Sequence, residues 1–454
     1  MSPTRQEIFS PGILNIFGAK ARARSAYTEE ARALTALSRK RGVCERCRKF
    51  KARCDMPDSI YEPCRRCSLV VTGVLRQPCI RVNLVDISLH RIGSTKDSAL
   101  DGWMRSQQTL QIVNGVVGTG HRTLLLTQDF GFELEVTVAR YNAGVGDKVS
   151  YPWRDASGVA REYKMPPYYM INFEDTKQAM VEYNRRSFVS YIQRNLRDKN
   201  PIVWMTFQAA IRHSTKSQSP LVRNALLFWS GARLIERPWR LCGTDTLGLS
   251  PNEDIDSPWY GTVPVTPIMD TQLDHLVIDC LLIPLRQRIL AQLFDKILKK
   301  KKEDWFEIYL AMFVVMYNME RNFAYVLFFT SYYGVMGKFG SRGTSSLSES
   351  FIHACKTMLA YFHYVYNGAA ILSSPLEKSS LTMPEEQYAY IQALQKERTR
   401  QGDDLTLLKD KSMYETDMYW CHQLLFKDCQ VEKQNEKEID ELQEEDYLMH
   451  SEDD

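Results

Sequence analysis

The chain has 454 residues, of which 44% are hydrophobic and 25% are charged, and its formal net charge at pH 7 is +3. This length and hydrophobic content are enough for one small module and one large domain. No apolar stretch reaches the roughly 18 residues that a transmembrane helix needs. The nearest candidate, residues 308–329, is interrupted by Asn318, Glu320, Arg321 and Asn322, so we expect a buried helix there and no membrane partner.

Basic residues are concentrated toward the N-terminal end. Residues 1–81 contain 17 Lys or Arg and 7 Asp or Glu, an excess that is typical of proteins that bind polyanions. Residues 1–40 are expected to form a basic, largely disordered arm. Its pieces AKARAR (19–24) and SRKRG (38–42) suit a nuclear import signal or a phosphate-binding arm, and an Arg-rich start also suits a mitochondrial transit peptide.

Six cysteines follow the arm and define the module that we expect over residues 41–82. The gaps between them are 2, 6, 9, 2 and 11 residues, so each half has a C-x2-C pair and one later cysteine. Structural zinc takes four ligands in a tetrahedron, and six thiolates can serve two zinc ions if two sulfurs bridge both metals. The expected ligands of two zinc ions are Cys44, Cys47, Cys54, Cys64, Cys67 and Cys79.

The segment resembles the binuclear zinc cluster of fungal transcription factors. The C-R-x-x-K-x-x-C-D core of that family is present as Cys47, Arg48, Lys51, Cys54 and Asp55. The resemblance implies that Cys44 and Cys64 bridge the two metals and that a short helix follows each C-x2-C pair. The gap of 11 residues before Cys79 is longer than the usual family spacing.

The cysteines also allow two other interpretations. Disulfides are disfavoured, because the chain has no segment resembling a secretory signal and a basic chain of intracellular type keeps its thiols reduced. A zinc ribbon with one metal is compatible with the C-x2-C-x16-C-x2-C spacing of four of the cysteines. That interpretation leaves Cys54 and Cys79 without a role.

The resemblance also implies binding to double-stranded DNA at CGG-type triplets. The base-contacting lysine of the family corresponds to Lys51, and guanine O6 and N7 accept hydrogen bonds from Lys or Arg in the major groove. Residues expected to contact phosphate or neighbouring bases are Arg48, Lys49 and Arg53. Residues expected to hold the DNA backbone are Arg65 and Arg66.

Residues 83–120 are expected to be a linker. Leu84, Ile87 and Leu89 do not extend into the three or four heptads of a coiled coil, and Gly93 and Ser94 interrupt the run. Dimerisation through this segment is therefore unsupported, and the choice between monomer and dimer stays open.

Residues 121–430 are expected to be a mainly helical regulatory domain with a β region at about 121–170. Hydrophobic residues alternate with Glu and Thr over 132–138, as in a half-buried strand, and Tyr151 and Trp153 are expected to begin a partner strand. Pro284 should kink or divide the helix that contains it. Helices are expected from about 175 onward, and at 203–214, 220–237, 270–298, 304–333, 349–367, 385–400 and 410–428.

The chain ends in an acidic tail. Residues 430–454 contain 11 acidic residues and 2 lysines, interleaved with hydrophobic residues. We expect residues 431–454 to be disordered. This composition suits an activation segment that binds transcriptional coactivators, and equally a solubilising tail.

The expected fold is thus a small zinc-stabilised binuclear cluster module plus a large, mainly α-helical domain, with disordered termini. No P-loop, nucleophile elbow or HExxH site is present, so we do not expect an enzyme. The favoured function is a nuclear, sequence-specific regulator of RNA polymerase II genes. The alternative is a zinc-stabilised interaction protein with a zinc ribbon that contacts no bases.

Overall fold

The computed structural model describes residues 28–44, 47–48, 50–55, 64–69, 79, 81, 83–90, 120–144, 147–332, 341–366, 383–402 and 416–425. Residues 1–27 of the basic arm, residues 91–119 of the expected linker and the acidic tail lie outside these ranges. The predictions of disordered ends and of coactivator binding by the tail fall on those residues and stay predictions.

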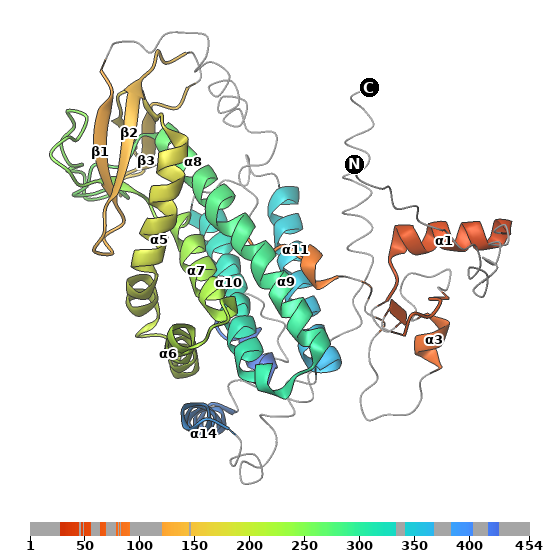
Figure 1. The fold of residues 1–454 in the computed structure, drawn as a ribbon. Coiled ribbons are helices and arrows are strands. Elements are labelled where there is room, and N and C mark those ends of the chain that lie inside the picture. The colour runs from red at the N-terminus through yellow and green to blue at the C-terminus, as the bar shows by residue number, and fades with distance from the viewer. Residues whose placement is uncertain are drawn as a thin grey trace, which may run out of the picture.

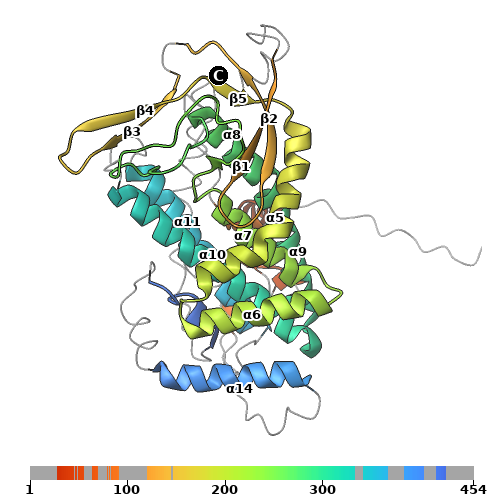
Figure 2. The same cartoon turned by 90° about the vertical axis from the view of Figure 1, so that its left-hand side faces the viewer.

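A bundle of helices forms the body of the protein, with a small sheet at one end (Figure 1). This confirms the expected mainly helical domain with a short β region before it. Helix α14 lies across one end of the bundle, against α6 (Figure 2). The helices of the body are α5 Phe173–Leu196, α6 Pro201–Lys216, α7 Leu221–Leu234, α8 Pro267–Val277, α9 Ile283–Lys299, α10 Trp305–Tyr332, α11 Ser341–Ala360 and α14 Glu385–Arg400.

Local sequence signals explain where several helices begin. Asn200 caps α6 by accepting a hydrogen bond from the Ile202 N–H (2.9 Å). Thr266 caps α8 in the same way through the Met269 N–H (3.2 Å). A proline occupies the first turn of both helices, where its missing N–H leaves no backbone bond unmade.

Pro284 divides its helix without stopping it. A π-helical stretch, Ile278–Leu282, joins α8 to α9 directly before the proline. Pro284 cannot donate the backbone hydrogen bond that an α-helix would require at this point, and the wider turn accommodates that loss. The expected division of this helix is therefore confirmed as a change of helix type.

The main sheet has the strand order β5-β2-β1-β6, and all its neighbours are antiparallel. Its strands are β1 Arg122–Thr127, β2 Leu134–Arg140, β5 Tyr168–Met170 and β6 Arg240–Leu241. Leu134, Val136 and Val138 of β2 are buried while Glu135 is exposed, so the strand predicted from alternation is confirmed. The β2 strand contacts α5, which places the apolar face of the sheet on the helical core.

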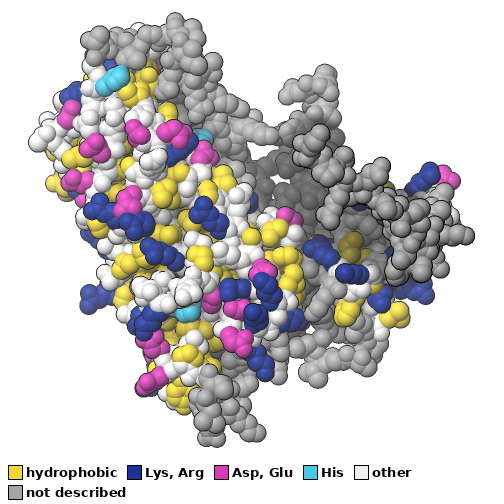
Figure 3. Space-filling view, viewed as in Figure 1, with side chains coloured by type: hydrophobic (Ala, Val, Ile, Leu, Met, Phe, Trp, Pro, Cys, Tyr) yellow, Lys and Arg dark blue, Asp and Glu magenta, His cyan; other side chains and the backbone are white. Residues whose placement is uncertain are grey.

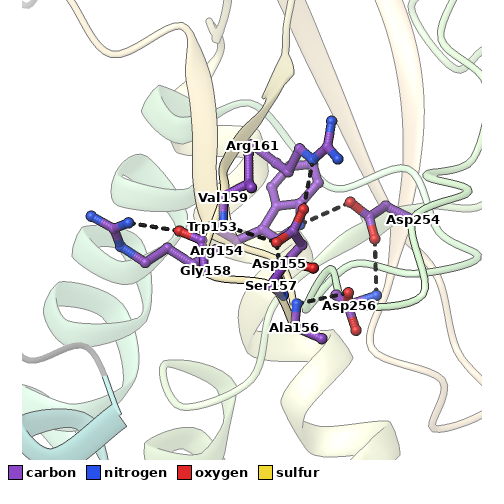
Figure 4. Close-up of polar contacts among 10 residues, drawn as sticks. All are labelled: Trp153, Arg154, Asp155, Ala156, Ser157, Gly158, Val159, Arg161, Asp254 and Asp256. Carbon is purple, nitrogen blue, oxygen red and sulfur yellow. Dashed lines mark hydrogen bonds and ion pairs between the residues drawn. The ribbon is translucent and has the colours of Figure 1, made fainter.

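A separate hairpin consists of β3 Ser150–Arg154 and β4 Ala160–Lys164. Tyr151 and Trp153 do begin a strand, but it pairs with β4 and not with the strand at 132–138. Figure 4 shows the polar contacts at the tip of the hairpin. The Asp155 carboxylate accepts the N–H groups of Ser157 (3.0 Å) and Val159 (2.9 Å).

The loop that contains residues 254–256 binds the hairpin by the same kind of contact. Asp254 accepts a hydrogen bond from Trp153 Nε1 (3.1 Å), and Asp256 accepts one from the Ala156 N–H (2.9 Å) (Figure 4). Both carboxylates therefore serve local turn structure.

Helix α10 lies at the centre of the body and packs against α6, α7, α9 and α11. Every residue from Trp305 to Glu320 is buried. The expectation of a buried helix over 308–329 is confirmed for residues 308–320, 322 and 323. None of the helices that the structure describes is long and apolar enough to span a bilayer.

Residues 83–90 pack onto this body; we call them the strap. They fall in the stretch that the sequence predicts to be a linker. The strap contains a short 3-10 helix, Leu84–Asp86, and lies against α9. Leu84, Ile87 and Leu89 belong to the same hydrophobic core as the helices. These residues are therefore part of the packed body in the structure.

A buried carboxylate on α10 holds the described residues 416–425. Glu320 accepts hydrogen bonds from the backbone N–H groups of Met418 (2.9 Å), Trp420 (2.7 Å) and Cys421 (2.7 Å). This segment lies within the helix expected over 410–428, but its described part is a turn followed by the 3-10 helix Cys421–Leu425. That helix prediction is wrong for these residues, because their backbone donors bond to a side chain of α10.

Glu320 makes the stability of the fold depend on pH. Burial raises the pKa of Glu320 to about 8, although the three N–H donors act in the opposite direction. Because this pKa lies above the unfolded value of about 4.3, the folded state binds a proton more tightly than the unfolded state does. The contribution of Glu320 to stability is fully present below that unfolded value and is lost as the pH rises toward 8.

We therefore expect the wild-type chain to lose stability relative to E320Q between pH 5 and pH 8, by up to about 1.4 kcal/mol per pH unit. Denaturant unfolding of both proteins over a pH series measures this difference. Parallel stability curves for the two proteins would show that Glu320 does not titrate in this range.

Candidate metal centre and nucleic-acid interface

The cysteine-rich segment follows a helix that the sequence did not predict. Helix α1, Glu29–Arg41, covers the end of the expected basic arm and runs into Gly42, whose φ is 71°. Glycine adopts this left-handed conformation without steric cost, so it suits the residue after a helix. A Cβ at Gly42 would lie 3.5 Å from the Arg81 carbonyl oxygen, so the two ends of the cysteine array come close together here.

Both halves of the array have the same backbone hydrogen bonds. The Arg48 N–H donates to the Cys44 carbonyl (2.9 Å), and the Ser68 N–H donates to the Cys64 carbonyl (3.0 Å). The second half forms the short helix α3, Arg65–Ser68. Each turn brings the first cysteine of its pair toward the second, as the internal repeat of the sequence predicts.

The six sulfurs form two groups of four that share two members. In each group all sulfur atoms lie within 4.8 Å of one another, and either group could hold a metal ion. The shared residues are Cys44 and Cys64. The first group is Cys44, Cys47, Cys54 and Cys64, and the second is Cys44, Cys64, Cys67 and Cys79.

The distances between sulfurs match a metal cage. The Cys44 and Cys64 sulfurs are 3.9 Å apart, and the pairs Cys44–Cys67 and Cys47–Cys64 are each 3.7 Å apart. A tetrahedron with metal–sulfur bonds of about 2.3 Å has edges of roughly 3.8 Å. The shared sulfur of each half thus lies at ligand spacing from the second cysteine of the other half.

Cys79 reaches the second group despite the long gap before it. Its sulfur accepts a hydrogen bond from the Cys64 N–H at 3.4 Å, which is the same distance that separates the Cys44 sulfur from the Cys47 N–H. The structure places all six expected ligands together.

The sulfurs form the interior of this segment. Cys44, Cys47, Cys54 and Cys64 are buried, and Val43 packs against them. Burial raises the pKa of the Cys54 thiol to about 12 and also raises the pKa of Cys47. Thiolates in such a place need a positive partner, and a metal ion supplies it.

Lys51 occupies a strained backbone position at the end of the first turn. Its φ is 47°, in the left-handed region that non-glycine residues rarely adopt. The Ala52 N–H donates to the Cys47 carbonyl (2.9 Å), and the Lys51 N–H donates to the Arg48 carbonyl (3.1 Å). This pair of bonds is the Schellman motif, in which glycine is the usual residue at the Lys51 position.

The expected DNA-contacting residues lie on the surface of the segment. Lys51, Arg48, Arg53 and the pair Arg65 and Arg66 are exposed, and Lys49 lies outside the described residues. Arg53 forms an ion pair with Asp55 (3.2 Å), but both side chains are more than half exposed, and such surface pairs contribute little. Figure 3 shows Lys and Arg side chains on this part of the molecule, to the right of the helical body.

Two exposed hydrophobic residues were not predicted. Phe50 is 63% exposed and Leu69 is 70% exposed. Phe50 directly precedes Lys51, and Leu69 follows α3, so each half has a large apolar side chain on its surface. The available signal in the sequence was an apolar residue two or three positions after each C-x2-C pair.

The helical part of the chain is similar to known proteins. A family model described as KpeA transcription factor matches residues 101–424, which is more than half of the chain. The satratoxin biosynthesis SC3 cluster transcription factor SAT20 of Stachybotrys chartarum is 24% identical over 417 residues, covering 86% of this chain and 56% of that protein. The chain thus spans about half the length of the curated relative that it matches. No solved structure matches the chain.

The backbone of Lys51 gives a test of local stability. We expect K51G to slow hydrogen exchange of the Ala52 amide about fivefold, because glycine removes roughly 1 kcal/mol of left-handed strain. The matched variant R53G changes Arg53, which is described and does not have a positive φ. Glycine there relieves no strain and gives the unfolded chain more freedom, so this variant should speed exchange. Faster exchange in K51G would mean that the Lys51 conformation carries no strain.

Proposed function

The chain belongs to the KpeA transcription factor family, and we propose that it is a nuclear regulator of RNA polymerase II genes that recognises CGG-type triplets through a binuclear zinc cluster. It is a transcription regulator and not an enzyme. The observation that carries the proposal is the sharing of Cys44 and Cys64 between two groups of four sulfurs. Six cysteines make two complete tetrahedral sites only with two shared ligands.

Two zinc ions would stabilise a module whose described residues form almost no apolar core. The buried ones among them are four cysteines, so metal–thiolate bonds would take the place of hydrophobic packing there. Two zinc ions and six thiolates carry a net charge of −2. The surrounding Lys and Arg side chains offset this charge and also favour DNA.

DNA recognition is assigned to the basic surface around Lys51. An exposed lysine at the end of a short turn can reach guanine O6 and N7 in the major groove. The basic residues around it would contact phosphate or neighbouring bases, and the phosphate contacts supply affinity but no sequence information. The residues assigned to these contacts are Arg48, Lys49, Arg53, Arg65 and Arg66.

The zinc ribbon remains the second candidate, and the geometry disfavours it. A ribbon would use Cys44, Cys47, Cys64 and Cys67 around one ion and would leave Cys54 and Cys79 without a metal. In the described residues Cys54 and Cys79 each complete a group of four, and the ribbon set is not one of these groups.

Zinc content separates the two candidates. We expect two zinc ions in each wild-type chain, measured by elemental analysis with protein quantified by amino-acid analysis. C44S and C64S remove a shared ligand and should lose both ions, whereas C54S should keep the ion of the second group and C79S that of the first. One ion in the wild type, unchanged in C54S, would establish the ribbon.

Substitution of Lys51 tests base recognition. We expect K51A to keep its zinc and to bind a CGG-bearing duplex about 5- to 150-fold more weakly, since one base contact is worth roughly 1–3 kcal/mol. R66A is the matched control for a phosphate contact. It should weaken binding to all duplexes alike and reduce the salt dependence by about one unit of slope. Unaltered K51A binding with zinc retained would exclude base contact by Lys51.

A further inference from the structure

The strap connects the cysteine module to the helical body over a very short length of chain. Asn83 is four residues after Cys79, so the two residues are at most about 14 Å apart. Within the strap Leu84, Ile87, Leu89 and His90 are buried, and the side chains of Leu84 and Leu89 have no exposed surface. The position of the strap therefore limits where the module can lie.

Side chains of α9 and α10 bind the backbone of the strap. Arg286 of α9 donates to the Ile87 carbonyl (3.4 Å). Asn318 and Asn322 of α10 both donate through Nδ2 to the Leu89 carbonyl, at 3.2 and 3.5 Å. The asparagines are four residues apart, so they project from the same face of the helix.

A buried arginine orients both asparagines. Arg233 of α7 donates through Nη2 to Oδ1 of Asn318 and of Asn322, at 3.1 Å in each case. With each amide oxygen facing the guanidinium, each Nδ2 group must face the strap. The side chain of Arg233 is only 3% exposed, and Glu236 balances its charge at 2.6 Å. Turning either amide over would bring its Nδ2 group against the guanidinium and take a bond away from the strap, so the bonds from Arg233 favour the orientation in which both amides donate to Leu89.

We propose that Asn318 and Asn322 are positioning residues for DNA recognition, which clamp the strap so that the helical body fixes the orientation of the cysteine module on its target. This inference rests on the proposed function for its DNA part. The helical body, and not a coiled coil after the cluster, would then orient the module. The clamp contacts the main chain of the strap, and the module follows through at most a few residues of chain.

The test uses the full chain and replaces the asparagines by leucine, which has a similar size and donates no hydrogen bond. The double variant N318L/N322L removes both bonds to Leu89. R286M removes only the bond to Ile87, leaves the Arg233 network intact and serves if the double variant does not fold.

The matched control is Q272M. Gln272 of α8 is also a buried amide, and it binds the backbone N–H and carbonyl of Met170 at 2.7 and 3.1 Å. The Q272M variant removes a comparable pair of buried hydrogen bonds at a place that does not contact the strap.

The first measurement is hydrogen exchange of residues 84–90 without DNA. We expect at least a tenfold increase in N318L/N322L, a smaller increase in R286M and none in Q272M. Equal protection in all four proteins would overturn the clamp. This result does not depend on whether the protein binds DNA.

The second measurement is energy transfer from tryptophan to a dye on one end of a duplex that contains a single CGG triplet. All eight tryptophans come after residue 100, so none lies in the cysteine module, and seven of them belong to the described residues of the body. A fixed body lies nearer one end of the duplex, so transfer should differ between the two labelled ends in the wild type and in Q272M. The difference should fall by at least half in N318L/N322L, while affinity for the triplet changes less than about twofold.

The outcomes separate the two proposals. A wild type that does not bind the triplet duplex overturns the proposed function, while the exchange result still decides whether the strap is clamped. Binding with equal transfer to both ends in the wild type overturns the positioning role. A difference between ends that persists in N318L/N322L overturns it as well.

Discussion

The need to satisfy buried polar groups on α10 is the constraint on which the arrangement of this chain depends. Asn318, Glu320 and Asn322 are all buried on a largely apolar helix, and each must find a partner inside the protein. Because successive residues turn by about 100°, the two asparagines share one face and Glu320 points to the opposite side. One face binds the strap before the helical domain, and the other binds the segment at 416–425. A single helix thus holds two segments more than 300 residues apart in sequence.

The two parts of the protein are stabilised by different physics. The helical body buries a continuous apolar core, in which local propensity matters less than packing. The cysteine module buries mainly sulfur, and its thiols are held at ligand spacing, where only a cation makes the crowding favourable. Metal loss should therefore affect the module first, and the strap limits how far that disorder spreads, since its contacts are made by the body and not by the metal.

The parts of the fold and of the site that depend on a local sequence pattern could be predicted. Ligand counting led to two shared sulfurs, alternation located β2, and the apolar run located α10. The strap could not be predicted, because three hydrophobic residues in a short segment do not specify partners more than 190 residues away. In the sequence, the polar residues of α10 argue only against a membrane span. In the structure Asn318, Glu320 and Asn322 bind the strap and the segment at 416–425 through backbone groups, which carry no signature in the sequence. The helix expected over 410–428 is wrong at 416–425 for the same reason.

The presence of a lysine at position 51 could not be predicted from the stability of the module alone. The end of the first turn requires a left-handed residue, and glycine would fill it with less strain. A lysine at that position is explained if its side chain is needed where the turn ends, next to the exposed Phe50 and within three residues of the exposed Arg48 and Arg53. Strain of about 1 kcal/mol does not exceed the roughly 1–3 kcal/mol of a base contact. On the proposed function, the residue that weakens the fold of the module is thus the one that makes the module specific.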